Sequence, residues 1–130
     1  AAPVLSMAIS PGFSDDGVLY AGTESSGLFM SSDGGQSWVS MGDECLPESI
    51  NVITVSPEYS SDSSLFVATN HYIFVSRDNG AEWQEWAPVP GVMALAAPHS
   101  LAGQQGVLVG TIDGSVGWAQ RTSPLISGQT

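Results

Sequence analysis

Positive charge is almost absent from this sequence: its 130 residues include no lysine and only two arginines, Arg77 and Arg121, against thirteen acidic residues. Phosphate contacts require clustered Lys or Arg, so this balance excludes nucleic-acid binding, and the same repulsion disfavours anionic membranes. An acidic surface instead keeps a protein soluble and attracts cations or basic partners. The sequence therefore predicts an acidic protein whose partner is not a nucleic acid.

Cysteine is nearly absent as well. Cys45 is the only one, which rules out an internal disulfide and leaves a crosslink between two chains open. No apolar run approaches the roughly 18 to 20 residues that a membrane helix needs, so no membrane insertion is expected. A signal segment is also missing, and the opening Ala1-Ala2-Pro3 would suit a chain already trimmed by a signal peptidase, although small residues are common at chain ends. From these features we expect a secreted or periplasmic protein.

Sustained helical periodicity is a third absence. Fifteen glycines and eight prolines, with many Ser, Thr, Asn and Asp residues, punctuate short apolar runs. Apolar residues make up 42% of the chain and charged residues 12%, which argues against disorder because disordered chains are rich in charge and poor in core formers. The composition predicts a single all-β domain.

The chain repeats itself. Residues 4–41 align with residues 50–86 across a single one-residue gap. The identical pairs are Ser10/Ser56, Pro11/Pro57, Ser14/Ser60, Asp16/Asp62, Leu19/Leu65, Thr23/Thr69, Phe29/Phe74, Ser31/Ser76, Asp33/Asp78, Gly35/Gly80 and Trp38/Trp83. A third, weaker copy follows between residues 92 and 120, with Thr111 in the place of Thr69 and Trp118 in that of Phe74.

Each copy contains short apolar or β-branched runs between turn-forming residues. In the first copy these runs lie at 4–10, 18–23, 28–31 and 37–41. Four strands in a repeat of about 40 to 45 residues are typical of a propeller blade, whereas a β-sandwich shows strands without such self-similarity. We expect residues 1–130 to form one partial β-propeller of about three four-stranded antiparallel blades, at 4–42, 50–87 and 91–127.

Two turns of the repeat share one pattern. The segments SSDGGQSW at 31–38 and SRDNGAEW at 76–83 both fit Ser-x-Asp-x-Gly-x-x-Trp. This pattern resembles the Asp-box, or BNR repeat, of sialidase-like, sortilin-like and photosystem-assembly-factor-like propellers. The resemblance is poor in the third copy, where Arg121 stands in the aspartate position and Ile126 in that of the tryptophan. It implies structural box residues at Ser31, Asp33, Gly35, Trp38, Ser76, Asp78, Gly80 and Trp83.

The chemistry of the box predicts a turn rather than a catalytic centre. The carboxylates of Asp33 and Asp78 can accept backbone N–H groups within their own turn, and the box glycines suit a positive φ. The indoles of Trp38 and Trp83 are expected to fold back over the blade edge and to bury about 150–250 Å² each. In the family that the pattern resembles, the box lies away from the catalytic centre, so no catalytic role is expected for these residues.

Enzymatic alternatives can be weighed on the charged residues. Sialidases bind their substrate carboxylate with three arginines, and this chain has two, so sialidase activity is not expected. A glycosidase that uses two carboxylates roughly 5 to 9.5 Å apart stays open. Its candidate acids in loops are Asp15, Asp16, Glu24, Asp62 and Asp113. Because Asp16 and Asp62 are equivalent in the repeat, a turn role is favoured for both.

Four residues are candidate ligand-binding residues. Glu24 and Asp113 follow strand ends, where propeller ligands often bind, although solvated loop acids are the commoner case. Trp86 and Trp118 could stack on a sugar face, although rim or core packing of such residues is the commoner case. These four residues are the candidates for contact with a carbohydrate ligand.

No metal or cofactor is expected. His71 and His99 each lack a second His or Cys at metal-ligand spacing. Calcium held by Asp15, Asp16 and their neighbours would fit the negative charge, but the regular spacing of a calcium loop is missing.

Three blades would leave two open flanks, because propellers close with about four to eight blades. Each flank would expose apolar surface, so we expect a homo-oligomer or another propeller chain that completes the ring. The expected function is a non-enzymatic propeller scaffold or assembly subunit. One alternative is a fragment of a carbohydrate-active Asp-box enzyme, glycoside hydrolase-like, or a glycan-binding module. Another is a binder similar to the photosystem family, whose basic patch this chain lacks.

Overall fold

The computed structural model describes residues 3–41, 46, 49–57, 59, 63–96 and 107–119. Within them the chain is all-β, as predicted, and forms three antiparallel sheets, none of which closes on itself. Several residues to which the sequence pattern drew attention lie outside the described ranges: Cys45, Asp62, His99, Arg121 and Ile126. No helix in the described part of the chain is long and apolar enough to span a bilayer.

Each sheet is a meander of consecutive strands. Sheet 1 contains β1 (Val4–Ile9), β2 (Leu19–Thr23), β3 (Leu28–Ser31) and β4 (Val39–Met41). Sheet 2 contains β5 (Val52–Val55), β6 (Leu65–Ala68), β7 (Ile73–Ser76) and β8 (Gln84–Ala87). Sheet 3 contains β9 (Val92–Ala96), β10 (Val107–Thr111) and β11 (Val116–Ala119).

One element was not expected from the sequence. A single helical turn, α1 (Phe13–Asp16), lies between β1 and β2. It ends at Gly17, whose φ of 61° is left-handed and whose N–H donates to the carbonyl of Phe13. Four residues are too few to produce a periodic apolar pattern, so the sequence shows only the turn-forming Asp-Asp-Gly.

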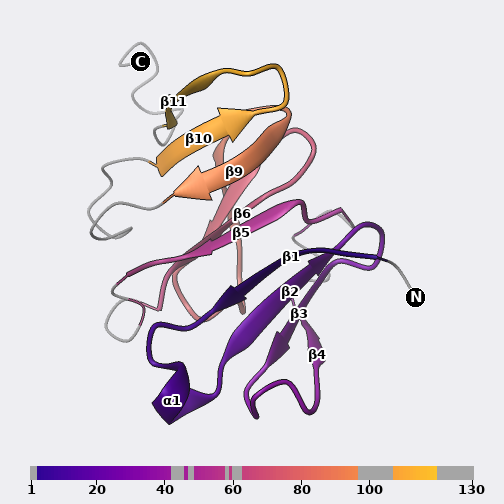
Figure 1. The fold of residues 1–130 in the computed structure, drawn as a ribbon, viewed down its shortest axis with the longest axis vertical. Helices are drawn as coiled ribbons and strands as arrows, with labels where there is room; N and C mark the ends of the chain where they lie inside the picture. The colour runs from indigo at the N-terminus through magenta and orange to yellow at the C-terminus, as the bar shows by residue number, and fades with distance from the viewer. Residues whose placement is uncertain are drawn as a thin grey trace.

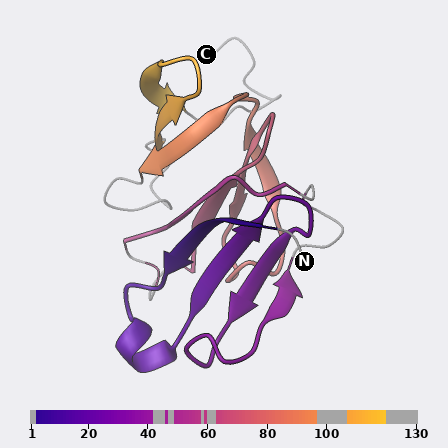
Figure 2. The same cartoon turned by 45° about the vertical axis from the view of Figure 1, so that its right-hand side comes forward.

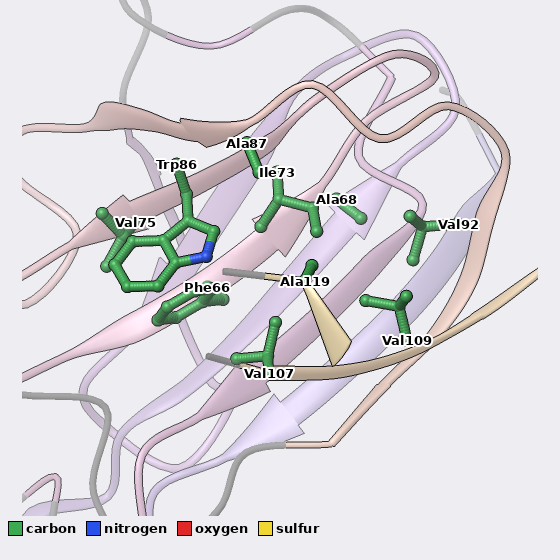
Figure 3. Close-up of a cluster of buried hydrophobic side chains, with 10 residues drawn as sticks. All are labelled: Phe66, Ala68, Ile73, Val75, Trp86, Ala87, Val92, Val107, Val109 and Ala119. Carbon is green, nitrogen blue, oxygen red and sulfur yellow. The ribbon is translucent and has the colours of Figure 1, made fainter. Parts of the chain in front are cut away.

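The sheets are stacked in chain order, with sheet 2 between sheets 1 and 3 (Figures 1 and 2). Their first strands contact one another, β1 with β5 and β5 with β9. One apolar cluster lies between sheets 1 and 2 and includes Tyr20, Leu28, Ile53, Leu65 and Val67. A second lies between sheets 2 and 3 and includes Phe66, Ile73, Trp86, Val107 and Val109 (Figure 3). Among the described residues, sheet 2 is therefore covered on both faces, whereas sheets 1 and 3 are each covered on one.

All three sheets have the same orientation in this stack: residues at equivalent repeat positions face the same direction along it. Neighbouring residues of a strand point to opposite faces, so residues at equivalent repeat positions reveal how each sheet is turned. Tyr20 packs toward sheet 2, and its equivalent Phe66 packs toward sheet 3. Val67 packs toward sheet 1, and Val109, its equivalent on β10, packs toward sheet 2. We call the face directed toward the preceding sheet the front face, and the face directed toward the following sheet the back face.

Candidate functional site

The first Ser-x-Asp-x-Gly-x-x-Trp segment, 31–38 (motif 1), forms the turn between β3 and β4. Ser31 Oγ donates to Asp33 Oδ1 at 2.8 Å, and the same oxygen accepts the backbone N–H of Ser37 at 2.9 Å. The N–H of Gly35 donates to Ser31 Oγ at 2.8 Å. Trp38 Nε1 donates to the carbonyl of Gly35 at 3.1 Å, which folds the indole back over the turn. The carboxylate is thus occupied within its own turn.

The second segment, 76–83 (motif 2), repeats this geometry between β7 and β8. Ser76 Oγ donates to Asp78 Oδ1 at 2.8 Å, which also accepts the N–H of Glu82 at 3.0 Å. Trp83 Nε1 donates to the carbonyl of Gly80 at 2.9 Å. Gly35 and Gly80 have φ values of 96° and 87°, which meets the expectation of a positive φ at both positions.

These hydrogen bonds favour the ionised carboxylates. The Ser37 side chain, the backbone N–H groups and Ser31 lower the pKa of Asp33 to about 2. The backbone N–H of Glu82 is the main cause that lowers the pKa of Asp78. Both groups are therefore anionic acceptors at neutral pH, and a general acid would need the opposite shift.

Both motif tryptophans fold back over their own turns, but they differ in burial. Trp83 is 7% exposed because it lies on the front face of sheet 2, against sheet 1. Motif 2 also touches sheet 1 directly, since Tyr20 Oη donates to the carbonyl of Asn79 at 3.0 Å. Trp38, the equivalent on sheet 1, is 37% exposed because no sheet lies in front of it among the described residues.

A buried tyrosine pair joins the same two sheets, and the sequence did not single it out. The hydroxyls of Tyr20 and Tyr59 lie 2.6 Å apart, and the two rings meet edge to face. Burial is the main cause that raises the pKa of both phenols, so both stay neutral hydrogen-bonding groups. The repeat offers no signal for this pair, because Phe66 stands in the position of Tyr20.

The two acidic ligand candidates lie on different sheets. Glu24 is exposed in the loop between β2 and β3 of sheet 1. Asp113 is exposed in the loop between β10 and β11 of sheet 3, and its carboxylate accepts hydrogen bonds from Thr111 and Ser115 in that loop. The hydroxyl of Thr111 is the main cause that lowers the pKa of Asp113. Sheet 2 lies between sheets 1 and 3, so these two candidates belong to the two end sheets of the stack.

Of the other carboxylates considered for a glycosidase pair, Asp16 also accepts hydrogen bonds from residues close to it in the chain. Asp16 accepts the hydroxyl of Ser10 at 2.7 Å and the N–H of Val18 at 2.9 Å. This pattern matches the turn role predicted for Asp16. Asp62 lies outside the described residues. No cluster of three or more His, Cys, Asp or Glu side chains suited to a metal ion occurs among the residues that the structure describes.

Trp86 packs in the core, which is the alternative favoured over stacking on a sugar. It is 1% exposed between sheets 2 and 3, with its ring centroid 4.7 Å from that of Phe66 (Figure 3). The guanidinium carbon of Arg77 lies 5.9 Å from the centre of the Trp86 ring, a cation–π contact. Both residues therefore contribute to packing.

Trp118 is 59% exposed, and its place in the repeat differs from the predicted one. It pairs with Leu108 as Val75 pairs with Phe66, so it is equivalent to Val75 rather than Phe74. The loop from Thr111 to Ser115 is one residue longer than the loop from Thr69 to Tyr72, which shifts the alignment. Trp118 therefore lies on the back face of sheet 3.

One open hollow of about 470 Å³ lies beside motif 2. Its lining residues are Val75, Arg77, Asp78, Glu82, Trp83 and Gln84. Asp78 is engaged in its own turn and Arg77 contacts Trp86, so these two charged groups already have partners within the fold.

The most conspicuous surface feature is a pair of apolar faces at the two ends of the stack, which no segment of the described chain covers; the sequence predicted two exposed apolar flanks. Met7 and Ile9 on β1 are each 58% exposed, and Val116 and Trp118 on β11 are 76% and 59% exposed. Soluble chains rarely expose such groups side by side unless a partner covers them. The arrangement thus offers packing surfaces rather than a set of reactive groups. Neither the protein-family models nor the curated proteins compared with this chain match it.

Proposed function

We propose that this chain is a β-propeller segment that acts as a non-enzymatic interaction scaffold. The observation that carries the proposal is the stack of three meander sheets, all turned the same way, with their first strands in contact. Radial stacking of four-stranded meanders around a central axis has these properties. A stack of this kind buries its internal faces and leaves its two end faces for partners.

The turn motifs support the same function. Their resemblance to the Asp-box fits a propeller, and the box aspartates are hydrogen-bonded within their turns. A catalytic pair of carboxylates needs one group that holds a proton near neutral pH. The resolved pKa shifts of Asp33, Asp78 and Asp113 all go down, so these groups support turns rather than acid catalysis.

A carbohydrate-binding role is the second candidate, favoured by one observation. The indole of Trp118 is 59% exposed on β11, and exposed aromatic faces suit sugar stacking. Trp118 pairs with Leu108, and the next pair on the same face is Gly110 and Val116. None of these neighbours has a polar side chain that would bind sugar hydroxyls. A protein partner therefore fits this surface better.

Site-specific photocrosslinking tests the scaffold. A benzoyl-phenylalanine placed at Trp118, in the cells that produce the protein, should crosslink to a polypeptide, either a second copy of this chain or another protein. The same group at Tyr72 is the control, because Tyr72 is an exposed aromatic residue in the loop between β6 and β7 of sheet 2, whose two faces are already covered. Equal crosslinking at both positions, or crosslinking at neither, would contradict the proposal. Binding on a glycan array that is lost in Trp118→Ala would favour the carbohydrate role instead.

A further inference from the structure

We propose that the front face of sheet 1 and the back face of sheet 3 bind each other between two copies of this chain, in a closed, head-to-tail dimer. This inference deepens the proposed scaffold and rests on it. The two faces lie at opposite ends of the stack, so they cannot meet within one copy (Figure 2). In the proposed dimer, the front face of sheet 1 in each copy is covered by the back face of sheet 3 in the other copy.

The front face of sheet 1 is largely apolar, and its polar members are Ser31 and Ser40, which end the two cross-strand rows on β3 and β4. Ser6 Oγ accepts the N–H of Ile53, and Ala8 packs on the core between sheets 1 and 2, so the alternate residues Met7 and Ile9 point away from sheet 2. Met7 pairs with Ala21, which pairs with Phe29, and Ile9 pairs with Leu19. Trp38 lies at the far edge of the same face. This face therefore presents cross-strand rows of apolar side chains.

The back face of sheet 3 is apolar as well. Leu108 is flanked by Ala96 on one side and Trp118 on the other, and Gly110 is flanked by Ala94 and Val116. These residues form two adjacent cross-strand rows. None of their side chains carries a charge or a hydrogen-bonding group other than the indole N–H of Trp118.

The two internal interfaces of the chain are the template for the proposed contact. Between sheets 1 and 2, a back face that includes Tyr20 packs on a front face that includes Val67 and Trp83. Between sheets 2 and 3, a back face that includes Phe66 packs on a front face that includes Val109. In both cases a back face covers a front face, so the back face of sheet 3 is the surface of this chain that matches the front face of sheet 1.

In the dimer, Leu108 of one copy would take the place of Tyr20, and Trp38 of the other copy that of Trp83. The proposed contact would thus bury the motif tryptophan that the single chain leaves 37% exposed. A contact between two different faces forms a ring if its rotation closes and an open filament if it does not. Two copies supply six sheets, which falls within the roughly four to eight blades of closed propellers.

Molar mass in solution tests the dimer. Light scattering after size exclusion, at roughly 100 μM chain, should give about 27 kDa, which is 2 × 13.5 kDa. Met7→Lys and Trp118→Asp each place a charge in the proposed contact and should each raise the Kd at least about 30-fold. Both residues are more than half exposed in one copy, so the fold should survive, as circular dichroism checks. Tyr72→Lys is the matched control and should stay dimeric.

A mixing experiment separates loss of the contact from misfolding. The Met7→Lys copy keeps an intact sheet 3, and the Trp118→Asp copy keeps an intact sheet 1. An equal mixture therefore restores one native contact and brings Lys and Asp together at the other, so it should dimerise although neither variant does so alone. Failure of the mixture to dimerise would overturn the head-to-tail arrangement.

Two other outcomes would also overturn the inference. A wild-type chain that stays at 13.5 kDa at this concentration would exclude the second copy as occupant, and a ladder of larger species would exclude closure. The scaffold itself has a separate readout. A monomeric chain that still crosslinks through position 118 to a different protein would leave the proposed function standing and remove the dimer.

Discussion

At the residue scale, Asp33 shows how the motif turns depend on charge. Its exposed carboxylate accepts hydrogen bonds from Ser31, from the N–H of Gln36, and from both the N–H and the hydroxyl of Ser37. Ionised acceptors form stronger hydrogen bonds than neutral ones. The ionised carboxylate of Asp33 therefore stabilises the turn through these hydrogen bonds, and protonation of Asp33 weakens them.

The pH dependence of stability should reveal this contribution. The pKa of Asp33 falls from 3.8 to about 2 in the folded chain, so the folded state gains stability above about pH 4 and loses it as the pH falls toward 2. Asp33→Asn should lower the urea midpoint at neutral pH, and the gap from wild type should narrow as the pH approaches 2. Glu24→Gln removes a charge from an exposed loop and serves as the control. A gap that stays constant with pH would contradict the role of the ionised form.

The motif tryptophans show what a sequence pattern can and cannot predict at this scale. Both indoles fold back onto their own turn, and this local geometry follows from the spacing of Gly35 to Trp38 and of Gly80 to Trp83. Their burial differs because it depends on the sheet in front of them, which is not encoded within the motif. The same reason places Trp86 in the core and Trp118 on the surface, although both were candidates for stacking on a sugar.

At the element scale, the close approach of sheets 1 and 2 depends on a glycine in β2. A Cβ added at Gly22 would lie 2.6 Å from Cγ2 of Ile50 and 2.8 Å from its carbonyl oxygen. The N–H of Ile50 donates to the carbonyl of Thr23, so the chain entering sheet 2 is fixed against the end of β2. The backbone has no room for a side chain at this crossing.

Two alanine substitutions test this approach. Gly22→Ala should destabilise the fold by about 1–3 kcal/mol, because the clash involves backbone atoms that cannot move freely. Gly110 occupies the equivalent position on β10, where an added Cβ would lie 3.8 Å from that of Ala94, an ordinary contact. Because Gly110 also lies in the proposed dimer contact, both substitutions are made in the monomeric Met7→Lys background, where Gly110→Ala should change stability by no more than about 0.5 kcal/mol. Chemical denaturation of both variants measures the difference, and equal losses would show that sheet packing is not the cause.

Strand positions were largely readable from the sequence, because short apolar runs between turn-forming residues define them locally. The first copy was expected to have strands at 4–10, 18–23, 28–31 and 37–41, and β1 to β4 lie within these ranges. Register in the third copy was not readable, since one extra loop residue before Ser115 moves Trp118 to the opposite face. The number of repeats predicts two open flanks, but which residues of each strand face them depends on the packing of whole sheets and cannot be read from single-strand patterns.

At the scale of the whole molecule, the charge of the chain opposes its own association. The formal net charge is −11, whereas the two faces of the proposed contact carry no charged side chain. Two copies therefore repel each other at long range and attract only on contact. Salt screens this repulsion over a distance that shortens from about 30 Å at 0.01 M to about 3 Å at 1 M.

Ionic strength should consequently strengthen dimer formation. Raising NaCl from about 0.02 M to about 0.5 M should lower the Kd of the dimer and raise the thermal midpoint. Sedimentation at several salt concentrations measures the first, and a thermal melt the second. A dimer that weakens with added salt would indicate attractive ion pairs at the contact, contrary to its apolar residues.

The meander topology has a consequence for how the polypeptide is made. Sheet 1 pairs only strands between Val4 and Met41, and sheet 2 only strands between Val52 and Ala87. Pairings between near neighbours in the chain close short loops, which is the kind of contact that forms fastest. A nascent chain can thus fold one meander before the ribosome has synthesised the next. Each new meander can then pack on the apolar face of a sheet that is already folded.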